Sequence, residues 1–206
     1  MNTQPVVNHV VPEIHHEQIL VVRRDILFPH EPALQGIKAE NIDEWVKIIT
    51  ANQLFGPREQ MEQDPIYKQI IPYLIFKHHD KYFLMQRSAQ ASEQRLQSKY
   101  SLGIGGHIRQ EDIASATIFD WAKREFHEEV AYADAFTIKP LGILNDDSNQ
   151  VGRVHVGLVL LLEGQTEHIA IKSELKSGQL LTLQECHHYY DLMENWSKMV
   201  FDFLNQ

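Results

Sequence analysis

Hydrophobic and polar positions along the chain change spacing at about residue 69. Before that point, residues 41–52 carry apolar side chains at helical spacing, which predicts a helix, and residues 58–63 fit a short helical turn. Residues 18–28 are apolar on both sides of a charged centre, which predicts a strand or strand pair broken near Arg23. From residue 69 onward, short apolar runs predict strands over 69–77, 82–87, 99–103, 136–145, 152–162 and 168–171.

Two longer segments in the second part of the chain have helical periodicity. They cover residues 113–131 and residues 183–204, and the second is expected in two pieces that divide near 187–190. The strands at 69–77 and 82–87 flank a polar turn and should form a hairpin. A mixed sheet with one central and one C-terminal helix predicts an α/β fold of the α/β/α sandwich type.

The helix predicted at 113–131 has two chemically different faces. Its apolar face should pack on the sheet, and it carries Ile118, Trp121, Ala122, Phe126 and Val130. Its other face places Glu125, Glu128 and Glu129 three and four positions apart, so their carboxylates project from one sector. Three like charges this close repel one another, and a divalent cation between them would relieve that repulsion. Hard carboxylate oxygens favour Mg²⁺ or Mn²⁺.

A glycine turn precedes the acidic helix and strengthens the prediction of a metal site. Gly103, Gly105 and Gly106 allow close approach of the backbone to another group. With the following residues, the segment resembles the Nudix hydrolase signature, Gly-x5-Glu-x7-Arg-Glu-U-x-Glu-Glu-x-Gly-U, where U is a bulky apolar residue. The C-terminal half of the signature is matched by Arg124, Glu125, Phe126, Glu128, Glu129 and Tyr132.

The segment departs from the signature at three positions. Counted from Gly106, the first acidic position is Asp112, with Glu111 beside it, and either residue could fill that role. The spacer from Asp112 to Arg124 holds eleven residues instead of seven, which is about one helical turn more. Ala131 stands at the late glycine position. The surrounding segments 35–37, 67–73 and 99–108 are similar to a MutT-like branch of predicted phosphoesterases.

The resemblance implies a fold, an activity and a set of roles. Nudix hydrolases are α/β/α sandwiches that cleave a pyrophosphate bond in a nucleoside diphosphate derivative or related organic pyrophosphate. Here Mg²⁺ or Mn²⁺ would be held by Glu125, Glu128 and Glu129, and Arg124 would orient these glutamates. A carboxylate from a late loop, Glu174, is the candidate general base. Residues 67–206 would form the Nudix domain, and residues 1–66 an extension that packs on it, covers the site or supports a homodimer.

Other residues have the chemistry to bind the phosphates of a small-molecule diphosphate. Arg87 ends a predicted strand and Arg95 lies in the next loop, and a guanidinium suits a phosphate. The backbone of Gly105, Gly106 and His107 could contact a phosphate or supply a carbonyl to the metal. His155 is expected to be a hydrogen-bonded histidine of the sheet. Substrate specificity is expected from the loops at residues 88–98, 146–150 and 172–182.

Composition narrows the class of protein. The 206 residues are 43% hydrophobic and 23% charged, as in a globular domain, and the net charge of −9 argues against general binding to nucleic acid. The single cysteine, Cys186, excludes an intrachain disulfide and fits a cytoplasmic location. We find no apolar run of membrane-spanning length and no secretory signal pattern, so no membrane association is expected.

Two alternatives to an enzyme remain open from the sequence. The first is a non-catalytic Nudix-like domain that binds a nucleotide or has a regulatory role, although such domains usually lose one or more of the glutamates. The second is an interaction protein whose acidic helix is only a solvated face. Metal binding and turnover of a diphosphate would distinguish an enzyme from both alternatives.

Overall fold

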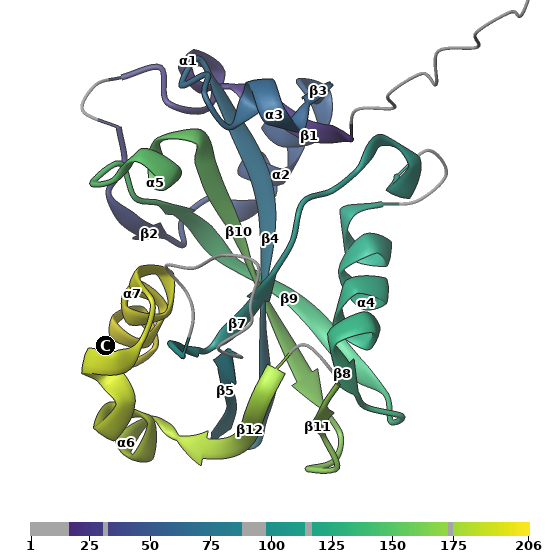
Figure 1. Cartoon of the computed structure of the whole chain (residues 1–206), viewed down its shortest axis with the longest axis vertical. Helices are drawn as coiled ribbons and strands as arrows, with labels where there is room; N and C mark the ends of the chain where they lie inside the picture. Colours follow the sequence, from purple (N-terminus) through teal and green to yellow (C-terminus); the bar gives the residue numbers. More distant parts are fainter. Residues whose placement is uncertain (1–16, 31–32, 88–97, 114–116, 173–174) are drawn as a thin grey trace, which may run out of the picture.

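A mixed β-sheet organises the molecule. The computed structural model describes residues 17–30, 33–87, 98–113, 117–172 and 175–206. Within them, ten strands form one sheet, and β4 and β10 run parallel at its centre with antiparallel neighbours on either side (Figure 1). Its main path is β12 (Leu175–Thr182), β5 (Lys81–Arg87), β4 (Tyr67–His78), β10 (His155–Gly164), β9 (Phe136–Asn145) and β2 (Gly36–Lys38).

The two central strands send alternate side chains to two separate cores. On β10, Val156 and Leu158 belong to the larger core, whereas Val159 between Leu158 and Leu160 belongs to the smaller one. The same alternation on β4 puts Leu74 in the larger core and Tyr73 in the smaller one. Side chains of successive strand residues point to opposite faces, so apolar residues at nearly every position require cover on both faces.

Helices supply that cover. Helix α4 (Ile118–Glu129) lies over the larger core, and helices α6 (Leu183–Cys186) and α7 (Asn195–Leu204) lie over the smaller core on the opposite face (Figure 1). A 3₁₀ turn at His187–Leu192 separates α6 from α7, which is where the sequence predicted a division. The predicted α/β fold with helices on both faces of a mixed sheet is confirmed.

The N-terminal segment adds strands and short helices to the sheet. Strand β1 (Gln18–Arg23) pairs with β4 and with β3 (Leu54–Pro57), and β2 pairs with β9. Between these strands lie α1 (Arg24–Leu27), α2 (Ile42–Ala51) and α3 (Arg58–Met61). The helices predicted at 41–52 and 58–63 are confirmed, and the boundary at residue 66 between an extension and a domain stays a prediction.

Several segments differ from the sequence predictions. The second half of 18–28 is the helical turn α1, not a strand. The strand predicted over 152–162 begins at His155, because Asn149 caps α5 (Gln150–Val154) by accepting a hydrogen bond from the Gly152 N–H. Residues 175–182, predicted as loop, form strand β12 at the sheet edge. Helix α4 begins at Ile118, and residues 114–116 lie outside the described part.

Short strands complete the fold. Strands β6 (Tyr100–Ser101) and β7 (Gly103–Gly105) pair with β5 and β4, and a separate pair joins β8 (Val130–Ala131) to β11 (Ala170–Ile171). Strand β7 ends at the glycine turn, so its pairing with β4 brings that turn beside the central strands. The hairpin predicted from β4 and β5 is confirmed.

Candidate active site

Helix α4 starts with a capping box that sets the position of its acidic face. The Thr117 hydroxyl accepts a hydrogen bond from the Asp120 N–H at 3.2 Å, and the Asp120 carboxylate accepts one from the Thr117 N–H at 3.0 Å. This pairing satisfies two backbone donors at the helix start. The predicted apolar face is confirmed within the helix, where its side chains are buried: Ile118, Trp121, Ala122 and Phe126. Val130 is buried as well, but the helix ends at Glu129 and Val130 lies in strand β8.

Asp112 takes the first acidic position of the motif. Its carboxylate lies 2.6 Å from the guanidinium of Arg124 and also accepts a hydrogen bond from the Trp121 indole at 3.1 Å. The backbone N–H of Arg109 donates to the same carboxylate at 2.9 Å. Glu111 is exposed. The choice between Glu111 and Asp112, which the sequence left open, is therefore settled in favour of Asp112.

Arg124 links Asp112 to the glutamates. Its Nε lies 3.4 Å from the carboxylate of Glu128, one turn further along α4. The guanidinium fork can hold two carboxylates in a fixed orientation, as a lysine ammonium cannot. The longer spacer leaves this pairing intact, because the 3₁₀ turn at Gln110–Asp112 brings Asp112 back towards the helix.

The glycine turn leaves room for one of the glutamates. A Cβ atom on Gly106 would lie 2.6 Å from Oε1 of Glu125, which is closer than two non-bonded atoms can approach. Glycine at this position therefore allows the Glu125 carboxylate to sit against the backbone of the turn. This contact explains why a glycine precedes the acidic helix.

Glu125 is the most perturbed acid of the three. Burial, followed by repulsion from Glu128 and Glu129, raises the pKa of its carboxyl to about 7. The repulsion expected from three clustered carboxylates is therefore present, but desolvation is the larger cause of the shift.

A cavity of about 930 Å³ opens over the acidic helix, and most of the predicted site residues line it. They come from α4, the glycine turn and the end of β5, and comprise Arg87, Gly105, Gly106, His107, Arg124, Glu125, Glu128 and Glu129. Arg95 and Glu174, predicted to bind phosphate and to act as the general base, lie outside the described residues. His155, expected only to be a hydrogen-bonded sheet histidine, also lines this cavity and does hydrogen-bond the Val151 carbonyl.

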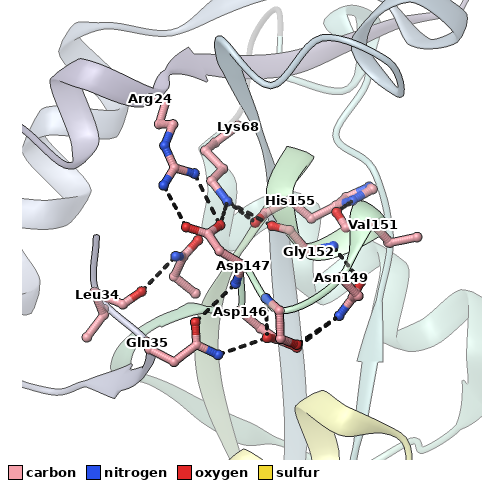
Figure 2. A network of polar contacts seen from close by, with 12 residues as sticks. Arg24, Leu34, Gln35, Lys68, Asp146, Asp147, Asn149, Val151, Gly152 and His155 are labelled. Carbon is pink, nitrogen blue, oxygen red and sulfur yellow. Dashed lines mark hydrogen bonds and ion pairs between the residues drawn. The ribbon is translucent and has the colours of Figure 1, made fainter. Parts of the chain in front are cut away.

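A polar network lies around the loop at residues 146–150, where the sequence expected a contribution to substrate specificity, and Asp146 and Asn149 of this loop line the cavity. Figure 2 shows Asp146 receiving hydrogen bonds from Gln35 at 2.8 Å and from Asn149 at 3.1 Å. Beside it, the Asp147 carboxylate lies 2.6 Å from Arg24 and 2.7 Å from Lys68, whose side chain is fully buried. The partners of this loop, Gln35, Arg24 and Lys68, lie far from it in the sequence and were not predicted to contact it.

Electrostatics keep Asp147 ionised. Burial alone would raise the pKa of its carboxyl, but the hydrogen bonds and charges of Arg24 and Lys68 outweigh it and lower the pKa to about 2. Lys68 also donates to the backbone carbonyls of Gly152 and His155, at 2.8 and 3.2 Å. The network therefore ties β4 and the N-terminal segment to the start of β10.

Comparisons with known proteins identify the family. No protein-family model matches the sequence. Protein YmaB of Bacillus subtilis (strain 168) is 35% identical over 202 residues, which span 91% of this chain and 97% of YmaB. Among solved structures, Tm1382, assigned as a Nudix hydrolase, has 27% identity and a TM-score of 0.74 over 91% of this chain and 98% of its own.

The chain belongs to the Nudix hydrolase superfamily. Another Nudix structure, the domain of Shewanella oneidensis NrtR in complex with ADP-ribose, has a TM-score of 0.53 at 14% identity, over 67% of this chain and 86% of its own. That likeness concerns the fold. The likeness to Nudix hydrolase structures supports an enzyme of the pyrophosphohydrolase class, as the sequence predicted. Within the described ranges, no helix has the length and apolar character to cross a membrane.

Proposed function

We propose that this protein hydrolyses a pyrophosphate bond in a nucleoside diphosphate derivative or related organic pyrophosphate, with Mg²⁺ or Mn²⁺. The observation that carries the proposal is the arrangement of Glu125, Glu128 and Glu129 along one wall of a 930 Å³ cavity. Glu125 is buried and repelled by two neighbouring carboxylates, so its negative charge is stable there only when a cation lies beside it, and otherwise it takes up a proton.

The donor set fits a hard divalent cation. Glu125, Glu128 and Glu129 offer carboxylate oxygens, and Gly106 of the glycine turn lies beside Glu125. The bound cation would neutralise phosphate charge and acidify the attacking water. Arg124 acts as a positioning residue, because it contacts Asp112 and Glu128 and thereby orients the acidic helix face.

Arg87 has the properties of a phosphate-binding side chain. Its Nε atom is buried in the cavity wall, and among the described residues no acceptor lies within hydrogen-bonding distance of it. A buried donor without an acceptor costs about 1 to 3 kcal/mol, and a phosphate oxygen would relieve that cost. We propose that Arg87 binds the substrate phosphates together with the backbone of Gly105, Gly106 and His107, and that Arg95 assists from the adjoining loop.

The general base remains a proposal from the resemblance. Glu174 would take the proton of the attacking water, from a position directly before β12. A Glu174→Gln variant should lower kcat and change the pH profile of kcat, while leaving KM near its wild-type value. An unaltered pH profile would exclude this role.

The N-terminal segment and the assembly state also belong to the proposal. We propose that residues 1–66 form an extension of a Nudix domain at 67–206 and that the protein is a cytoplasmic homodimer. Sedimentation analysis of the full chain would measure the assembly state, and a monomer at micromolar concentration would exclude the dimer.

The test of function is a substrate panel with defined active-site variants. ADP-ribose, dinucleoside diphosphates, sugar nucleotides and nucleoside triphosphates are incubated with Mg²⁺, Mn²⁺ or chelator, and the products are identified. We expect metal-dependent cleavage of at least one diphosphate and its loss in Glu128→Gln and Glu129→Gln. The matched control is Glu163→Gln. Glu163 is exposed and lies near the C-terminal end of β10, whereas His155 of the cavity lies at the N-terminal end. Tight binding of a nucleotide without turnover would support the non-catalytic alternative.

A further inference from the structure

Three side chains outside the acidic helix form a second group that could ligate a metal ion. Glu62 follows α3, His107 follows the glycine turn, and His155 opens β10. One ligand atom from each lies within 4.8 Å of the others. His107 Nε2 is 3.4 Å from His155 Nε2 and 3.9 Å from the Glu62 carboxylate. Three segments that are far apart in the sequence therefore point these atoms at one position.

Backbone hydrogen bonding fixes the tautomer of His155. Its Nδ1 lies 2.8 Å from the carbonyl oxygen of Val151 (both labelled in Figure 2). A carbonyl can only accept, so Nδ1 carries the proton and Nε2 has its lone pair directed at His107. A metal-bound histidine is usually held in this way, with its second ring nitrogen donating to a carbonyl or carboxylate.

The separation of the two imidazole nitrogens matches a shared metal ion. Two nitrogens bound at about 2.05 Å with a tetrahedral angle would lie about 3.3 Å apart. The observed 3.4 Å is close to this value. The separation is at the long end for a hydrogen bond between the two rings, and it also suits a common ion.

His107 has a hydrogen-bond acceptor in Gln69. Gln69 donates from Nε2 to the Met61 carbonyl at 3.1 Å, which turns its Oε1 towards His107 at 2.7 Å. In the metal-free protein the Nε2 of His107 therefore carries a proton and donates it to Gln69. Metal binding through Nε2 requires that this proton move to Nδ1 or to solvent and that the hydrogen bond to Gln69 be given up. Gln69 Oε1 then faces the same position as a potential oxygen ligand.

The positive charges of two arginines near the cluster are paired with a carboxylate. Arg58 and Arg109 pair with the two oxygens of the Glu17 carboxylate, at 3.0 and 2.7 Å. These pairs reduce the repulsion that the guanidinium groups would exert on a cation. Glu62 adds one negative charge at the cluster, 3.9 Å from His107, and it also pairs with Arg58 at 3.6 Å, so an ion would share this carboxylate with Arg58.

We propose that His107, His155 and Glu62 bind a divalent transition-metal ion of the Zn²⁺ type, distinct from the Mg²⁺ or Mn²⁺ ion at the acidic helix. Two imidazole nitrogens and one carboxylate oxygen suit Zn²⁺ and Co²⁺, whereas Mg²⁺ prefers oxygen ligands alone. The ion would join the N-terminal segment to the core at the cavity edge, because Glu62 precedes β4 and both histidines line the cavity.

The test measures metal binding directly and does not use hydrolysis, so it is independent of the proposed function. Metal-free full-length protein is titrated with Co²⁺ in excess Mg²⁺, and the ligand-field absorption of Co²⁺ is followed. Zn²⁺ is then added as a competitor. We expect one tight Co²⁺ site per chain, with an absorption typical of four- or five-coordinate Co²⁺ bound to nitrogen, that Zn²⁺ displaces.

Variants separate this site from the acidic helix and from general effects on folding. His107→Ala and His155→Ala should each abolish the tight site, and Glu62→Gln, which removes a half-exposed group, should weaken it about tenfold or more. Glu128→Gln should bind as wild type does, and so should the control His188→Ala, an exposed histidine outside the cavity. Circular dichroism of each metal-free variant confirms that it is folded.

Three results of these titrations would contradict the proposed site. Absence of a tight Co²⁺ site in the wild-type protein would overturn the proposal. So would a site that survives in folded His107→Ala or that disappears in Glu128→Gln. If His155→Ala does not fold, the half-exposed Glu62→Gln variant and His107→Ala still provide the test.

Discussion

The guanidinium of Arg124 lies 2.6 Å from the carboxylate of Asp112, across a spacer four residues longer than in the common Nudix pattern. The same guanidinium reaches Glu128 on the next helical turn. The pair thus connects the loop before α4 to the face that carries the proposed metal ligands. The added residues alter the path of the chain between these partners and leave the pairing itself in place.

Replacing Asp112 should cost stability and activity together. Asp112→Asn removes the charge that holds Arg124 and weakens the hydrogen bonds from Trp121 and Arg109. We expect the free energy of unfolding to fall by roughly 1 to 2 kcal/mol, measured by denaturant titration, and kcat/KM to fall with it. Glu111→Gln, at the exposed neighbour, should change stability by less than about 0.5 kcal/mol. An equal loss of unfolding free energy in both variants would mean that Asp112 is not the acidic residue that pairs with Arg124.

A methyl group on Gly106 should displace Glu125 without unfolding the protein. Its Cβ would lie 2.6 Å from Oε1, at the flexible end of the Glu125 side chain, which can rotate away. For Gly106→Ala we therefore expect a stability change below about 1 kcal/mol and a Mg²⁺ affinity reduced about tenfold or more.

A double-mutant cycle identifies the cause of this effect. In a Glu125→Gln background, Gly106→Ala should have little further effect on metal affinity, because the displaced ligand is already absent. Calorimetric titration with Mg²⁺ measures all four proteins. Additive losses would show that Gly106 acts through some other group.

Metal binding should release a proton from Glu125 below neutral pH. The pKa of Glu125 is raised to about 7 in the metal-free protein, so at about pH 6 most chains carry a proton there, and bound Mg²⁺ must displace it. Calorimetry in two buffers of different ionisation enthalpy should give nearly one proton per ion at about pH 6 and almost none at about pH 9. The Glu125→Gln protein should release none at either pH.

The same shift predicts how the stability of the metal-free protein depends on pH. The folded-state pKa of Glu125 lies above its unfolded value of 4.5, so its contribution to stability is complete below about pH 4.5 and is lost as the pH rises through about 7. Unfolding in the presence of chelator should show this decline, and Glu125→Gln should reduce it. Saturating Mg²⁺ should restore the stability at high pH.

Asp147 should govern stability in acid. Its folded-state pKa of about 2 lies below the usual 3.8, so its stabilising contribution is present above about pH 4 and is lost as the pH falls through about 2. A difference of this size corresponds to roughly 2 kcal/mol. Asp147→Asn should lose most of this acid dependence and should also be less stable at neutral pH, since Lys68 is left buried without its counter-charge. Unchanged acid unfolding would contradict the pairing.

Much of the fold could be predicted because its signals are local. The spacing of Ile118, Ala122 and Phe126 determines which face of α4 is buried, and that face in turn determines where Glu125 and its neighbours point. Strands β4 and β10 are apolar on both faces, so their central position also follows from the sequence. The capping box at Thr117 and Asp120 was a readable signal for the start of α4, and it was missed.

Other features depend on contacts that no local pattern encodes. Strand β12 is held by its backbone ladder with β5, while its polar, exposed residues, Ser177 to Gln179, read as loop. The choice of Asp112 over Glu111 depends on the position of Arg124 in space. The cluster of Glu62, His107 and His155 comes from three segments that only the folded sheet brings together.

The most direct test of the central claim is Mn²⁺ binding measured by electron paramagnetic resonance, in parallel with hydrolysis of the best diphosphate substrate. The wild-type protein and Glu163→Gln should bind Mn²⁺ and hydrolyse the substrate. Glu128→Gln and Glu129→Gln should lose both properties together, with rates reduced about a hundredfold or more. Wild-type rates of hydrolysis in either variant would contradict the claim that these carboxylates hold the catalytic metal.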